Sequence, residues 1–130
     1  MHASLGVAHR GRAVAIAYAR EGADILISYL DEHEDAEATR QLIEAEGRKA
    51  VLLAGDIQHP GHCRGVVQTA VKELGGIDIL VNVAGVVSLG SAQALAEAEW
   101  DRVIAINLKG TFLCCQAVLA GMQKRQRGRI

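Results

Sequence analysis

Aromatic residues, proline and cysteine are all scarce in this chain of 130 residues. It has one Trp, two Tyr, one Phe, one Pro and three Cys. A core without aromatic side chains must be built from Ala, Val, Ile and Leu, which suits parallel α/β layers whose strands are buried on both faces. The three cysteines form no spaced framework, and an odd number without an export signal favours free thiols in a reducing compartment. We therefore expect no disulfide and a cytoplasmic location.

Strong net charge and long apolar runs are also lacking. The formal net charge is -1, so no excess of basic charge draws the chain to nucleic acid or to anionic lipid. The longest apolar runs, at 77–81 and 103–106, are far shorter than the ~18 residues of a membrane span. The opening residues Met1–Ser4 do not resemble a signal peptide. We expect no nucleic-acid and no membrane partner, and favour small-molecule or protein partners.

Three short apolar runs alternate with segments of helical periodicity. The runs at 23–29, 49–53 and 77–82 predict buried strands. Helical spacing of apolar residues predicts helices at 11–21, about 32–46, about 60–74, about 97–105 and about 108–126. Residues 128–130 look like the lead into a further strand. Strands separated by helices indicate one α/β domain over residues 1–130 with a parallel sheet, although a flavodoxin-like receiver shares this order.

Polar and small residues follow two of these strands and begin the last helix. Asp56 follows the run at 49–53, and Asn82–Gly85 (Asn-Val-Ala-Gly) follows the run at 77–82. Asn107 stands where the long final helix begins. Ligands of open parallel sheets bind beyond the carboxyl ends of the strands, so these residues are candidates for a binding site.

With these residues the chain resembles the short-chain dehydrogenase/reductase family, from about Gly11 to its last residue. Four ordered segments carry the resemblance: GRAVAIAYAREGA at 11–23, GDI at 55–57, DILVNVAG at 78–85 and EWDRVIAINLKGTF at 99–112. The subgroup it looks most similar to contains the glucose dehydrogenases and general-stress-type reductases. The resemblance implies a Rossmann-like doubly wound fold and an NAD(P)-dependent oxidoreductase that moves a hydride between nicotinamide and a small carbonyl or alcohol substrate.

The resemblance also implies roles for individual residues. Asp56 would contact the adenine, and Asn107 would be the asparagine of the catalytic tetrad, which kinks its helix and holds a water for proton relay. Small residues after the third predicted strand would flank the adenosine ribose. The implied cofactor-binding residues are Gly11, Tyr29, Asp56, Ile57, Asn82, Ala84 and Gly85.

Cofactor preference depends on the end of the second strand of the family fold, where an acidic residue would bind the ribose 2′-OH. Tyr29 stands there, with Asp31 slightly beyond. This favours NADP or dual use of NADP and NAD; a strand-ending aromatic residue without a binding role is the alternative.

The glycine loop of the family departs from its pattern in this chain. The pattern Thr-Gly-x-x-x-Gly-x-Gly, aligned on Gly11, places Ser4, Leu5 and His9 where Thr, Gly and Gly belong. Glycines let backbone N–H groups approach a pyrophosphate at a helix N-terminus without a Cβ in the way. Leu5 and His9 would crowd that approach, so we expect weak phosphate binding.

The proton donor of the family is not encoded. It is a tyrosine with a lysine four residues later, which lowers the pKa of the phenol. Four residues beyond Tyr18 and Tyr29 stand Gly22 and His33, and the strand that bears the catalytic serine would begin just past Ile130. Asn107 is therefore the one tetrad member we expect in this chain.

The first strand of the family fold is also expected to be missing, because residues 1–10 hold no strand-like run longer than 5–8. In the family's strand order, 3-2-1-4-5, it separates the strands at 23–29 and 77–82. Unpaired backbone groups at ~1 to 3 kcal/mol each would make the isolated chain marginal. We expect those two strands to pair directly or to borrow an edge from another chain.

Several residues have a structural interpretation beside the functional one. Asp56 could be only a turn cap. His59, His62 and Cys63 lack a fourth ligand, so we expect no metal site. Cys114 and Cys115 are expected to be small core residues, and Trp100 to pack its short helix onto the core.

Two hypotheses follow. In the first, the chain is a fragment of an NAD(P)-dependent oxidoreductase that is catalytically incomplete alone. In the second, it is a non-catalytic remnant of a dinucleotide fold that binds a partner subunit through the helix at 108–126, or has no activity. In relatives that helix builds dimer and tetramer contacts, so it is the surface through which a homo-oligomer would form.

Overall fold

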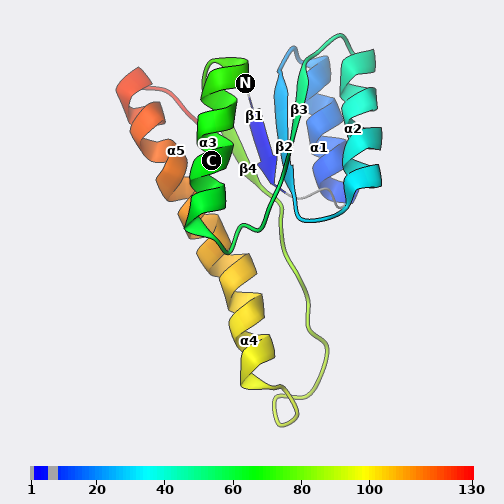
Figure 1. The fold of residues 1–130 in the computed structure, drawn as a ribbon, viewed down its shortest axis with the longest axis vertical. Coiled ribbons are helices and arrows are strands. Elements are labelled where there is room, and N and C mark those ends of the chain that lie inside the picture. Colours follow the sequence, from blue (N-terminus) through cyan, green and yellow to red (C-terminus); the bar gives the residue numbers. More distant parts are fainter. Residues whose placement is uncertain (1, 6–8) are drawn as a thin grey trace.

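A computed structural model describes residues 2–5 and 9–130 and shows one parallel four-stranded sheet with helices on both faces (Figure 1). The strands are β1 (His2–Leu5), β2 (Ile25–Tyr29), β3 (Ala50–Ala54) and β4 (Ile79–Asn82), in the order β3-β2-β1-β4. The helices are α1 (His9–Arg20), α2 (His33–Ala45), α3 (Pro60–Leu74), α4 (Glu97–Ile104), the π-helix η1 (Ala105–Gly110) and α5 (Thr111–Arg125). This is the predicted Rossmann-like α/β fold.

Two apolar clusters fill the space between the sheet and its two helical layers. Successive residues of β2 point to opposite faces, as the pleat of a strand requires. Leu26 therefore packs with residues of α3 and α5, whereas Ile25 and Ile27 pack with residues of α1 and α2. Figure 1 shows these two helix pairs on opposite sides of the sheet. The burial of β2 on both faces confirms the interpretation of its apolar run.

The first strand is present, contrary to the expectation that it is missing. β1 lies between β2 and β4, where it pairs His2 with Ile25 and Ile79, and Leu5 with Ser28 and Asn82. The prediction that the strands at 23–29 and 77–82 pair directly is therefore wrong. The predicted cost of unpaired backbone groups in the centre of the sheet is also wrong, because β1 forms hydrogen bonds with β2 on one side and with β4 on the other. Its sequence, HASL, has little strand propensity, and pairing with two buried neighbours outweighs it.

Near the end of the chain one residue pairs with the outer edge of β4, within the segment 128–130 that looked like the lead into a further strand. Arg129 forms a parallel bridge with Ile79 on the outer edge of β4. The Leu80 N–H donates to the Arg129 carbonyl at 3.0 Å, and the Arg129 N–H donates to the Asp78 carbonyl at 3.0 Å. The order of the paired segments then follows the 3-2-1-4-5 order that the resemblance implies.

The helices α4, η1 and α5 run on without a break from Glu97 to Arg125. None of the α4 residues is buried and Trp100 is 57% exposed, so the prediction that Trp100 packs onto the core is wrong. Figure 1 shows α4 projecting beyond the sheet. By length and composition alone this helix is long and apolar enough to cross a membrane, a test that core helices also pass. Its second half behaves as a core helix, because Cys114, Val118 and Met122 are buried in the cluster shared with α3.

Candidate functional site

A pocket opens at the carboxyl ends of β2, β3 and β4. It contains five of the predicted cofactor-binding residues: Tyr29, Asp56, Ile57, Ala84 and Gly85. The other lining residues are Ser28, Leu30, Glu32, Gly55, Val83, Val86 and Ile106. The loops that follow β2, β3 and β4 thus meet at one edge of the sheet, where open parallel sheets bind ligands. The binding roles of these residues remain predictions.

Asp56 is held in place by the turn that it caps. Its Oδ1 accepts the Gln58 backbone N–H at 2.8 Å, and its Oδ2 accepts the Gln58 side-chain amide at 3.0 Å. The turn-cap interpretation of Asp56 therefore describes a real contact. It does not exclude binding, because each carboxylate oxygen has two lone pairs and Asp56 also lines the pocket.

Tyr29 is tied to the first turn of α2. Its hydroxyl lies 3.0 Å from His33 Nδ1, and the two rings meet edge to face with centroids 5.3 Å apart. Next to it, a Glu32 carboxylate oxygen accepts the Asp31 N–H at 3.2 Å, and Glu32 lines the pocket. Among the described residues that line the pocket, Glu32 and Asp56 are the charged ones and neither Lys nor Arg occurs. The electrostatic character of the site is therefore acidic.

Asn107 holds the loop that follows β4. Its Oδ1 accepts the Val86 N–H at 2.8 Å and its Nδ2 donates to the Val86 carbonyl at 2.8 Å. A Cβ added at Gly85 would lie 3.5 Å from Asn107 Oδ1, which is ordinary contact. Asn107 itself lies in η1, and a π-helical segment is a local irregularity of the kind often found at functional sites. The side chain thus fixes one wall of the pocket from outside it.

Two predicted residues, Asn82 and Gly11, do not line the pocket. The Asn82 side-chain amide donates to Cys115 Sγ at 3.7 Å, and its Oδ1 is buried with no hydrogen-bond partner among the described atoms. Gly11 is buried within α1. The side chains of Leu5 and His9 lie outside what the structure describes, so the predicted crowding of a pyrophosphate stays a prediction.

His62 belongs to the site in a way that sequence reasoning missed. It was considered only as a metal ligand, but its Nε2 shares a hydrogen bond of 2.8 Å with Ser28 Oγ at the end of β2. Within residues 2–5 and 9–130, no three His, Cys, Asp or Glu side chains are placed to share a metal ion. The sequence places His62 and Ser28 34 residues apart, and no periodicity links them.

The cysteines are free thiols within the core. Cys63 and Cys114 are buried with their sulfurs 3.5 Å apart, and Cys115 is half-buried. Burial raises the pKa of the Cys114 thiol well above its usual range, because a thiolate would lose its hydration there. The Cys114 thiol therefore acts as a small apolar side chain at neutral pH, in line with its predicted core role.

Comparison with known proteins shows the family and the fold of this chain. The family model described as short chain dehydrogenase matches residues 8–130. General stress protein 39 of Bacillus subtilis is 60% identical over 75 residues, which are 58% of this chain and 26% of that protein. The chain spans about a quarter to a half of the length of the curated relatives it matches.

Two solved structures show the same fold. A short-chain type dehydrogenase/reductase from Mycobacterium marinum is 30% identical and superposes with a TM-score of 0.88 over 95% of this chain and 51% of its own. A structure of NAD⁺-bound xylitol dehydrogenase is 26% identical, with a TM-score of 0.92 over 99% of this chain and 50% of its own. The fold and these similarities place the chain in the class of Rossmann-like oxidoreductases. This chain belongs to the short-chain dehydrogenase family.

Proposed function

We propose that this chain is the adenosine-binding part of an NAD(P)-dependent oxidoreductase that moves a hydride between nicotinamide and a small carbonyl or alcohol substrate. The observation that carries the proposal is the pocket where Tyr29, Asp56, Ile57, Ala84 and Gly85 meet. Its lining combines the small residues Ala84 and Gly85 with the apolar Ile57, and such residues can pack against a flat base. A similar structure has NAD⁺ bound, which supports a dinucleotide as the ligand class.

The polar groups of the pocket suit an adenosine. Asp56, oriented by Gln58, has lone pairs free to accept a hydrogen bond from the adenine amino group. Ile57 offers an apolar surface for a face of the base. Glu32, which also lines the pocket, can accept a hydrogen bond from a ribose hydroxyl. The chain then supplies both kinds of contact that an adenosine needs.

The charges of the pocket favour NAD over NADP. Tyr29 at the end of β2 pointed to NADP or dual use, since it is not an acid. In space, however, Glu32 and Asp56 both line the pocket and no described lining residue is cationic. A 2′-phosphate would bring about two negative charges at neutral pH toward these carboxylates, which repel it. We therefore propose NAD as the preferred cofactor, with NADP bound less tightly.

This part of the fold binds but does not turn over substrate alone. Neither Tyr18 nor Tyr29 has a lysine four residues later, and the Tyr29 phenol faces an imidazole instead. Asn107 is the tetrad member that the chain supplies. Three free thiols also lead us to propose a cytoplasmic location.

A second role as a subunit-interaction module is favoured by one observation. Exposed large apolar side chains lie along the helix from α4 to α5: Trp100, Leu108, Phe112 and Leu119. Protein partners cover such surfaces. We propose self-association through this helix, which sedimentation of the native chain beside Phe112→Glu would measure. Loss of a dimer in the variant supports the proposal, and a monomeric native chain refutes it.

Calorimetric titration with NADH, NADPH and AMP tests the cofactor proposal. We expect weak binding, micromolar or weaker, with NADH tighter than NADPH. Asp56→Ala should weaken AMP binding about tenfold, because a hydrogen bond to a charged group contributes ~1.5 to 3 kcal/mol. Asp101→Ala, on the exposed α4, is the matched control and should change nothing. Absence of binding by the native chain, or tighter binding of NADPH, contradicts the proposal.

A further inference from the structure

Two consecutive residues at the start of α3 lie behind one wall of the pocket. The wall is the segment from Gly55 to Ile57, and all three of its residues line the pocket. The Cys63 thiol donates to the Ile57 carbonyl at 3.4 Å. The preceding residue, His62, bonds to Ser28, which is 1% exposed and also lines the pocket. The first turn of α3 is thus attached to both sides of the pocket.

The imidazole of His62 presses directly on the backbone of Gly55. A Cβ at position 55 would overlap the ring atoms, so any larger residue there would displace the ring. Gly55 in turn donates its N–H to the Tyr29 carbonyl at 2.8 Å. The ring therefore fills the space between the end of β2 and the loop after β3. His62 itself is not among the residues that line the pocket.

A neutral imidazole at His62 is compatible with its position against Gly55. Burial lowers the pKa of the imidazole, against the opposing effect of Asp56, while His59 lowers it further. The ring is then neutral at pH 7, with one nitrogen able to donate and the other able to accept. A neutral ring can be packed against Gly55 and bonded to Ser28 without placing a cation beneath the site.

We propose that His62 is a positioning residue for nucleotide binding, whose imidazole, wedged against Gly55 and bonded to Ser28, sets the separation between the end of β2 and the loop that carries Asp56. This inference rests on the proposed function of the pocket. The residue acts through its neighbours and makes no contact with the ligand. If the ring is removed, the Gly55–Ile57 wall loses its support, and Asp56 loses its fixed position relative to Tyr29.

The experiment compares three variants of the whole chain. His62→Ala removes the ring, His62→Gln keeps a polar group that can reach Ser28, and His59→Ala removes an exposed histidine three residues earlier. Each is titrated with AMP at a temperature where its own melting curve shows it folded. Hydrogen exchange of the amides at 55–58 is followed without ligand. A variant that only lowers global stability is not expected to change both the AMP affinity and the local exchange rate while it remains folded.

We expect His62→Ala to weaken AMP binding about tenfold, as losing a hydrogen bond and the packing around it would, and to speed exchange at 55–58. His62→Gln should recover most of the affinity, and His59→Ala should match the native chain. If native chain and His62→Ala bind AMP equally, the positioning role is refuted while the proposed pocket stands. If the ring is only filler, Gln fails as badly as Ala, which also refutes the role. If the native chain binds no AMP, both proposals fall together.

Discussion

Replacing Asn107 tests whether one side chain holds the loop after β4 against the pocket. Asn107→Ala removes two hydrogen bonds of 2.8 Å to the Val86 backbone, one in each direction. A typical intramolecular hydrogen bond contributes ~0.5 to 1.5 kcal/mol, so the pair contributes about 1 to 3 kcal/mol at most. The Asn107 residue is exposed, so water can replace part of both bonds, and we expect the lower end, about 1 kcal/mol.

The two bonds can be separated by a second variant. Asn107→Asp keeps an oxygen that can accept the Val86 N–H but loses the Nδ2 donor, and its carboxylate would face the Val86 carbonyl. We therefore expect a loss of stability at least as large as for Ala above the pKa of the new carboxyl, and a smaller one when acid protonates it. Lys109→Ala, exposed in the same π-helix, is the control and should be close to neutral.

The assay is thermal and urea unfolding combined with hydrogen exchange at Val86. Faster exchange at Val86 in Asn107→Ala, with the AMP affinity reduced, would show that the loop is held by this side chain. An unchanged Val86 exchange rate in that variant would refute the reasoning, whatever happened to the melting temperature. That result would mean that packing, and not the amide, fixes the loop.

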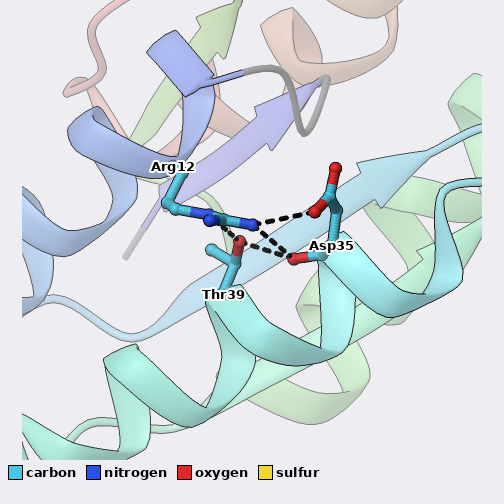
Figure 2. A network of polar contacts seen from close by, with 3 residues as sticks. All are labelled: Arg12, Asp35 and Thr39. Carbon is cyan, nitrogen blue, oxygen red and sulfur yellow. Dashed lines mark hydrogen bonds and ion pairs between the residues drawn. The ribbon is translucent and has the colours of Figure 1, made fainter.

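Three further results are expected. Gly110→Ala brings a Cβ to 2.7 Å from the δ-methyl of Ile57, so calorimetry should show about 1 kcal/mol of destabilisation and weaker AMP binding. As a control, Gly65→Ala, in open space within α3, should stabilise the fold by ~0.5 to 1 kcal/mol. Arg12→Ala breaks the contacts of α1 with Thr39 and Asp35 that Figure 2 shows, and urea unfolding should report a loss of about 1 kcal/mol. Burial lowers the pKa of His62 below 6.5, so the folded chain favours the neutral imidazole. The free energy of unfolding should therefore fall as the pH drops below 6.5, and His62→Gln should flatten that part of the plot of stability against pH.

The parts of the fold with local sequence signals were predicted well. Glycines at 22, 47 and 75 follow directly after the predicted helix ends at 21, about 46 and about 74, and each has a positive φ. The three apolar runs became β2, β3 and β4 within a few residues of the expected bounds. These features depend on short-range physics, on side-chain period and on the backbone freedom of glycine, which a single sequence displays directly.

Candidate residues for the pocket could be proposed from the sequence at the ends of strands. Asp56 and Gly85 could be placed because strand ends in a parallel sheet converge at one edge. The contributions of Glu32 and His62 could not be predicted. Glu32 lines the pocket from the loop after β2, and His62 packs against Gly55 without lining the pocket. Trp100 failed for a related reason, because whether an amphipathic helix finds a partner surface depends on chain far from it.

The missed first strand shows what burial patterns can add to propensity. Ile25–Ser28 is buried throughout and Leu80 is 2% exposed, although about 50 residues separate them in the sequence. Helices on both faces of the sheet cover the side chains of these strands, but they cannot form hydrogen bonds with the backbone N–H and C=O groups of the strands. A strand buried on both faces needs a hydrogen-bonded neighbour on each edge unless it is an edge strand. β3 forms hydrogen bonds with one edge of β2, so the other edge of β2 requires a further strand. The edge of β4 that faces β2 requires a strand for the same reason. Once the helices at 11–21 and 32–46 and the later elements were assigned, two longer segments were left without an element: the residues before α1 and residues 83–96. The structure places the first of these between β2 and β4. The number of unsatisfied edges therefore argues for β1 where the composition of HASL does not.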